Sequence, residues 1–104
     1  QKAMTLVYLG LQEEAVAVGE GNLETKKALL ATDPGNAARQ REVASATLLL
    51  GEIHRIAESG ERACALYENA RARYLEIDAR SPLSDYDRQT GLGAAEEGLA
   101  GCSG

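Results

Sequence analysis

Several residue types are scarce in this chain, and each scarcity excludes a class of protein. Tryptophan and phenylalanine are absent, and the 104 residues include one histidine, two prolines and two cysteines. A single histidine excludes a metal site with two histidine ligands, and two cysteines are too few for a disulfide framework. No apolar run approaches the roughly 20 residues that span a bilayer. We therefore expect no membrane-spanning segment and no cysteine-rich scaffold.

Basic residues are also few, with 11 Lys and Arg against 16 Asp and Glu and a net charge of −5. A nucleic-acid binder needs a clustered basic face, and a membrane-surface binder needs a polybasic patch. The charge therefore predicts neither nucleic-acid nor membrane partners.

What the chain has in quantity is alanine and leucine, and both favour helices. Apolar residues recur at steps of three and four, which predicts helices over residues 3–18, 22–32, 37–59, 61–80 and 85–99. The glycines of 19–21, Asp33-Pro34, Gly60 and the stretch 81–83 are expected to separate these helices. Asn36 and Ser84 have the sequence context of N-caps. No segment alternates with a period of two, so we predict no sheet.

The best-defined helix pair carries a spacing typical of a known repeat. Leu50, Gly51, Ala63, Tyr67 and Ala70 resemble the tetratricopeptide (TPR) pattern, with Leu-Gly in a first helix and small, aromatic and small residues along a second. Leu9 and Gly10 match the first helix of an earlier, degenerate copy. The resemblance implies that these seven residues pack the helices of each repeat together.

This resemblance implies an all-α fold of antiparallel helix-turn-helix repeats, with about two and a half units and roughly five helices. The whole chain, 1–104, would be a single domain. Residues 3–36 would form the degenerate repeat, residues 37–80 the best-matching repeat and residues 84–101 a terminal helix.

In TPR arrays the first helices line a concave groove that holds a partner's peptide or helix. By register, the resemblance assigns that groove to seven residues: Val7, Leu11, Glu14, Ser45, Leu48, Glu52 and Arg55. Its acidic members would favour a protein or peptide partner with some positive charge. The pattern is similar to divergent bacterial arrays attached to serine/threonine kinases. We therefore expect the C-terminal part of a larger bacterial protein.

No group of residues predicts catalysis, a cofactor or a metal site. His54 has no second histidine to pair with, and it occupies a position usually filled by a packing residue. Cys64 is expected to be a buried, inert thiol and Cys102 to lie in the tail; a disulfide between them is possible, but the sequence does not favour it. Free thiols and an alanine-rich helical composition suit a reducing cytoplasm. We expect a non-catalytic, cytoplasmic interaction module.

Two alternatives stay open at this stage. The chain could be a small helical bundle that self-associates as a homodimer through the apolar segment 3–18. It could also be an accessory region of a bacterial serine/threonine kinase whose catalytic domain is not in this sequence. An autonomous enzyme is the least favoured, because no base or nucleophile is predicted beside His54 or Cys64.

Overall fold

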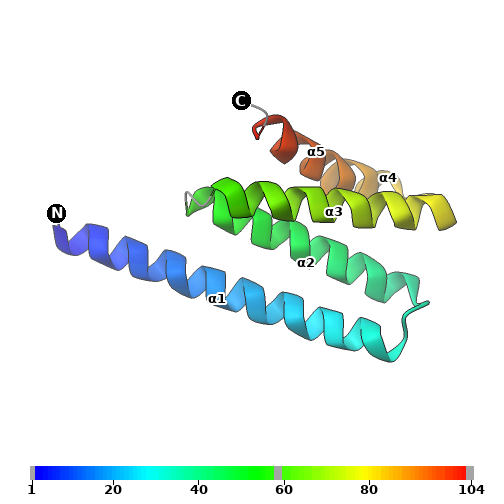
Figure 1. Ribbon diagram of the computed structural model, residues 1–104, viewed down its shortest axis with the longest axis horizontal. Helices are drawn as coiled ribbons and strands as arrows, with labels where there is room; N and C mark the ends of the chain where they lie inside the picture. Colours follow the sequence, from blue (N-terminus) through cyan, green and yellow to red (C-terminus); the bar gives the residue numbers. More distant parts are fainter. Residues whose placement is uncertain (1, 58–59, 103–104) are drawn as a thin grey trace.

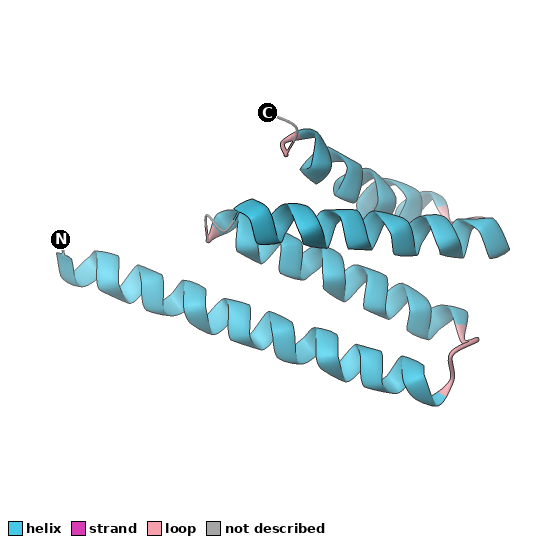
Figure 2. Ribbon diagram, viewed as in Figure 1, coloured by secondary structure: helices cyan, strands magenta, loops and turns pink. Residues whose placement is uncertain are grey.

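The computed structural model describes residues 2–57 and 60–102, with side chains from residue 10 onward in these ranges. Within this part of the chain all secondary structure is helical and no strand occurs (Figure 2). The predicted all-α class is therefore confirmed. The helices are α1 (Lys2–Thr32), α2 (Ala37–Ile56), α3 (Gly60–Arg80), α4 (Asp85–Asp87) and α5 (Gly93–Ala100), with a π-helical turn η1 (Arg88–Leu92) joining the last two.

The helices lie side by side, and each runs antiparallel to the one before it in the chain (Figure 1). Helix α2 lies between α1 and α3, and the continuous segment α4–η1–α5 packs mainly on α3. Since α4, η1 and α5 are continuous, the described residues form four helical segments, and the expected count of about five is not confirmed.

The difference arises in α1, which runs without a break through the stretch 19–21 that was predicted to be a turn. Gly19 is buried against α2, where a Cβ atom at this position would lie only 3.0 Å from Leu50 Cδ1. Each glycine costs a helix up to about 1 kcal/mol, and packing against α2 outweighs that cost. Residues 3–36 thus form one long helix and a loop instead of a helical hairpin.

The predicted helix starts are confirmed where polar caps were expected. Asn36 accepts a hydrogen bond from the backbone N–H of Arg39 at 3.1 Å, and Ser84 accepts one from the N–H of Asp87 at 3.1 Å. The helix before Pro34 ends at Thr32, as the restriction on residues preceding proline predicts. These signals depend on neighbouring residues only, which is why the sequence could reveal them.

The core consists of three clusters that follow α2 along its length. One cluster joins α1 to α2 and contains Leu23, Val43, Ala46 and Leu50. The second joins α2, α3 and α5 and contains Leu48, Ala63, Tyr67, Ala70 and Ala95. The third joins α2, α3 and η1 and contains Ala44, Tyr74, Ile77, Leu83 and Leu92. None of the helices in the described part of the chain has the length and apolar character needed to cross a membrane.

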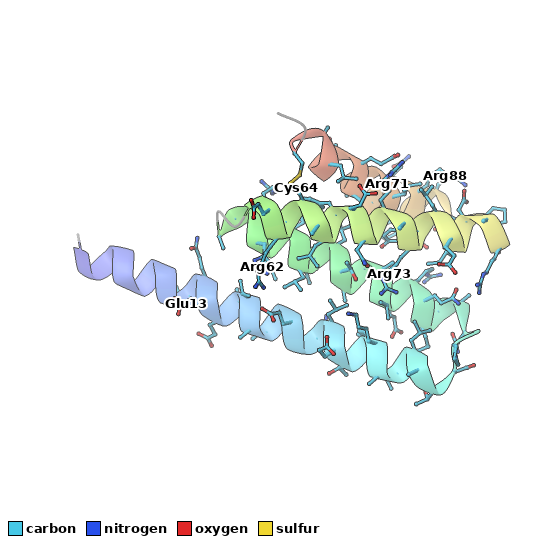
Figure 3. All side chains as sticks on the ribbon, in the orientation of Figure 1. Glu13, Arg62, Cys64, Arg71, Arg73 and Arg88 are labelled. Carbon is cyan, nitrogen blue, oxygen red and sulfur yellow. A yellow bond between two sulfur atoms is a disulfide. The ribbon has the colours of Figure 1, made fainter. Side chains whose placement is uncertain are left out.

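A disulfide joins Cys64 of α3 to Cys102, just after α5, with the two Cα atoms 5.9 Å apart. The expectation of an inert thiol at Cys64 is therefore wrong. The cause is topological, because α5 runs back along α3 and brings position 102 beside position 64 (Figure 3). The two cysteines are 38 residues apart in the sequence, and the number of cysteines alone does not show that α3 and α5 pack side by side.

Candidate interaction surface

The surface of interest lies where α1 crosses α2. Gly19 lets the two helices approach closely, and Leu23 fills the next turn against Val43 and Ala46. Gln12 Nε2 donates a hydrogen bond to the carbonyl of Ile56, the last residue of α2, at 3.3 Å. Residues 12 to 30 of α1 thus lie along α2, and the close backbone contacts of α1 with the other described elements are with α2.

The first ten residues of α1 project beyond the end of α2, since Gln12 already lies beside Ile56 (Figure 1). At 1.5 Å per residue, this projection is about 15 Å long. Its sequence, KAMTLVYLGL, is strongly apolar. An isolated helical stretch of this length is marginal in water and gains most of its stability from packing.

An open groove of about 630 Å³ runs between α1 and α2 next to this projection. Leu11, Ala15 and Val18 line it from α1 at helical spacing, and Leu49 and Ile53 line it from α2. Leu11 is 58% exposed, Val18 66% and Leu49 53%, so large apolar side chains face solvent here. We call these five residues the α1–α2 groove. Contiguous exposed apolar residues of this kind mark interaction sites.

The charges beside the groove are acidic. Glu14 lines it directly, and no Lys or Arg is among its lining residues. Glu13 lies on the outer side of α1 (Figure 3), and the first basic residue of α1 whose side chain the structure describes is Lys26. A partner that brings positive charge to this edge would therefore be attracted.

The structure separates the residues that the TPR register assigned to one groove. Leu11 and Glu14 do lie together in the α1–α2 groove, and the side chain of Val7 lies outside the described residues. Ser45 is exposed and lines a different cavity of about 450 Å³, together with Tyr74 and Tyr86.

The remaining three lie on the same stripe of α2 as Ser45, at steps of three and four, and this stripe turns toward α3. Leu48 is buried in the cluster beneath α5 and cannot reach a partner. Glu52 accepts a hydrogen bond from Arg55 at 2.8 Å, and Arg55 Nε also donates to the Tyr67 hydroxyl at 3.1 Å. These two residues therefore support the α2–α3 contact.

Most packing residues of the best-matching repeat are buried between α2 and α3, whereas Leu50 is buried in the cluster that joins α1 to α2. A Cβ atom added to Gly51 would lie 3.3 Å from Leu66 Cβ, so this glycine allows α2 and α3 to pack closely. Ala63, Tyr67 and Ala70 are almost completely buried. Gly10 is exposed and has no neighbour within 4 Å of its Cβ position, so it packs against nothing. The side chain of Leu9 lies outside the described residues.

Burial also sets the acid–base behaviour of the two core tyrosines. Desolvation raises the pKa of Tyr67, although the Arg55 hydrogen bond opposes this shift. Desolvation and the nearby Asp87 carboxylate raise the pKa of Tyr74. Both phenols therefore stay neutral, as packing groups do.

Sequence reasoning placed Ala15 and Val18 only in the segment 3–18 of a possible homodimer, and it did not assign Leu49 or Ile53 to a binding surface. Ala15 and Val18 continue the stripe of Leu11 at steps of four and three, which was the available signal. Nothing local shows that Leu49 and Ile53 face the same groove, since that depends on how α1 crosses α2. In the described residues no group of three or more His, Cys, Asp or Glu is placed to hold a metal ion.

Comparison with protein-family models, with curated proteins and with solved structures finds no match to this chain. The TPR resemblance therefore rests on the spacing of residues 50–70 alone.

Proposed function

We propose that this chain is a non-catalytic interaction module that binds an amphipathic helix of a partner protein in the α1–α2 groove. The observation that carries this proposal is the convergence of two exposed apolar stripes, one from each helix. A helix laid in such a groove inserts its own residues at i, i+3, i+4 and i+7. The α2–α3 packing at Gly51 and Tyr67 supports a TPR-like origin for the scaffold.

The partner helix is inferred to carry basic residues at its edges. The groove is bordered by Glu14 and has no lining cation, so positive flanks on the partner would speed association and fix its orientation. A second copy of this chain would bring its own acidic α1 to the same place. Charge therefore favours a different protein over a homodimer through residues 3–18.

The Cys64–Cys102 disulfide indicates the kind of cellular compartment in which this module resides. Disulfides persist in oxidising compartments and are rare in a reducing cytoplasm. The alanine-rich helical composition predicted a reducing cytoplasm, and the disulfide argues against that compartment. We infer an oxidising environment. The bacterial kinase attachment gains no support from any residue of this structure.

A designed peptide series tests the groove directly. Two labelled amphipathic helical peptides share one leucine face but carry either Lys or Glu at their edges, and fluorescence anisotropy measures their affinities. We expect the Lys peptide to bind at least about tenfold more tightly at low salt, with the difference shrinking as salt rises.

Val18→Asp then places a charge in the groove without touching the core, because Val18 is exposed. It should abolish binding of the Lys peptide. Leu75→Asp is the matched control, since Leu75 is an exposed apolar residue of α3 outside the groove. Equal binding by both variants would refute the proposed site.

A further inference from the structure

Asn22 places an amide side chain in the apolar groove, and the proposed function does not use it. It is an exposed residue of α1 and lines the α1–α2 groove one turn beyond Val18. Among the described residues, no group forms a hydrogen bond with its side-chain amide. A partner helix laid in the groove would cover this amide and remove it from water. A buried amide then needs a hydrogen-bonding group on the partner.

Asn22 belongs to a stripe of α1 whose members follow one another at alternating steps of three and four. They are Tyr8, Leu11, Ala15, Val18 and Asn22. This alternation is the spacing of residues that pack lengthwise against a neighbouring helix in coiled coils. Asn22 is the one amide in the stripe, and a single asparagine among apolar residues at such positions sets the register of the paired helices.

The residues that follow this stripe by one position hold α1 on α2. They include Gln12, Gly19 and Leu23, which all contact α2. One position rotates a side chain by about 100° around a helix. The stripe that contains Asn22 therefore lies beside the α1–α2 contact and not within it. Since Leu49 and Ile53 of α2 line the same groove, a third helix would pack against one stripe from each helix.

The groove changes character at Asn22. Asn22 and Leu49 also line the neighbouring cavity of about 450 Å³, so the two hollows adjoin at these residues. One turn further along α1, Lys26 lines that cavity and forms an ion pair with Glu42 at 3.7 Å. On the α1 side, the apolar lining therefore ends at Asn22. A partner helix must meet a polar group at this level of its own apolar stripe.

We propose that Asn22 fixes the register of the partner helix by pairing with an asparagine in the partner's apolar stripe. This inference rests on the proposed function and adds the one residue of the partner that the groove selects. Each amide can donate an N–H to the carbonyl oxygen of the other. A leucine at the same place would leave the amide of Asn22 buried and unpaired, which weakens binding.

Two labelled peptides test this proposal on the full oxidised chain. Both are Lys-edged amphipathic helices of three heptads, and they differ only at the centre of the apolar face, which is leucine in one and asparagine in the other. Fluorescence anisotropy measures their affinities. We expect the asparagine peptide to bind the parent chain about tenfold more tightly, because only this peptide pairs the amide of Asn22.

Asn22→Leu should reverse this preference. The variant has an apolar residue at position 22, so the leucine peptide should bind it about tenfold more tightly than the asparagine peptide. Position 22 is exposed and leucine favours helices, so the fold should persist. Asn22→Ala carries the test if Asn22→Leu does not fold, and it should also lose the preference for asparagine. Asn69→Leu is the matched control, because Asn69 is an exposed asparagine of α3 outside both hollows.

The outcomes separate this proposal from the one on which it rests. The same preference in the parent chain and in Asn22→Leu would overturn the register proposal, and so would a parent chain that prefers the leucine peptide. In both cases, loss of binding in Val18→Asp would still support the groove. If the parent chain bound neither peptide, the proposed function itself would be wrong.

Discussion

At the scale of single residues, the glycines of the last helical segment have a role that their helix propensity conceals. A Cβ atom on Gly98 would lie 2.6 Å from the ring of Tyr67, and one on Gly91 would lie 2.5 Å from Cζ of Tyr74. These two glycines therefore leave room for tyrosine rings of α3. The sequence alone suggested only that they weaken a helix, since the tyrosines lie 17 or more positions away.

Gly98→Ala should consequently destabilise the protein, contrary to helix propensity. The buried Tyr67 ring cannot move freely, so we expect a loss of about 1–3 kcal/mol in the free energy of unfolding. Gly21→Ala is the control, because Gly21 has open space at its Cβ position within α1. It should stabilise by up to about 1 kcal/mol. Denaturant unfolding of both variants measures the sign of each change in the free energy of unfolding. A stabilising Gly98→Ala would show that α5 does not pack against Tyr67.

The buried tyrosines predict a loss of stability in alkali. The pKa of Tyr74 is raised above the ordinary value of 10.0 by burial and by Asp87, so the folded state holds its proton longer than the unfolded state. This contribution to stability is complete below pH 10 and is lost as the pH rises through the raised pKa.

Tyr74→Phe should make the decline of the unfolding free energy above pH 10 less steep. Tyr67→Phe should also make the decline less steep, because burial raises the pKa of Tyr67 as well. Chemical denaturation at a series of pH values between 9 and 11 on the two variants and the parent measures the difference. Parallel slopes in all three chains would contradict a neutral, buried Tyr74.

At the scale of elements, local signals predicted where most helices begin and end, but tertiary packing decided whether α1 breaks. Asn36 and Ser84 act through hydrogen bonds three residues away, so their effect is visible in the sequence. Gly19 is different, because its effect depends on Leu50 and Ile53 of another helix. A glycine that looked like a turn is in fact a point of close contact between two helices.

The disulfide is expected to hold α5 in place. Helix α5 has eight residues, includes two glycines, and covers the cluster around Tyr67. Closing a loop over 38 residues restricts the unfolded chain, which stabilises the fold by about 4 kcal/mol in the chain-entropy account. Reduction should therefore lower the unfolding free energy by roughly this amount.

Hydrogen exchange locates that effect within the molecule. In the reduced protein, amides of α5 should exchange faster while amides of α2 keep most of their protection. Cys64→Ser combined with Cys102→Ser should reproduce the reduced pattern in the absence of a reductant. Uniform loss of protection across α1, α2 and α5 would contradict a local role for the disulfide.

At the scale of the whole molecule, the sequence could indicate an apolar stripe on α1 but not what faces it. Leu11 and Glu14 were assigned to a binding surface and do lie together in the groove. Leu48 was assigned to the same surface, yet α5 covers it. Periodicity identifies the buried or apolar face of one helix, whereas a groove requires the crossing of two.

The state of association follows from the charge around that groove. Two copies joined through the α1–α2 groove would bring Glu14 of each chain to one interface, and each chain carries a net charge of −5. We therefore expect light scattering to report a monomer of 11.0 kDa at low ionic strength. Any dimer should grow with added salt, which screens this repulsion, and should disappear in Val18→Asp. A dimer that is stable at low salt but lost in Val18→Asp would instead make a second copy the occupant of the groove.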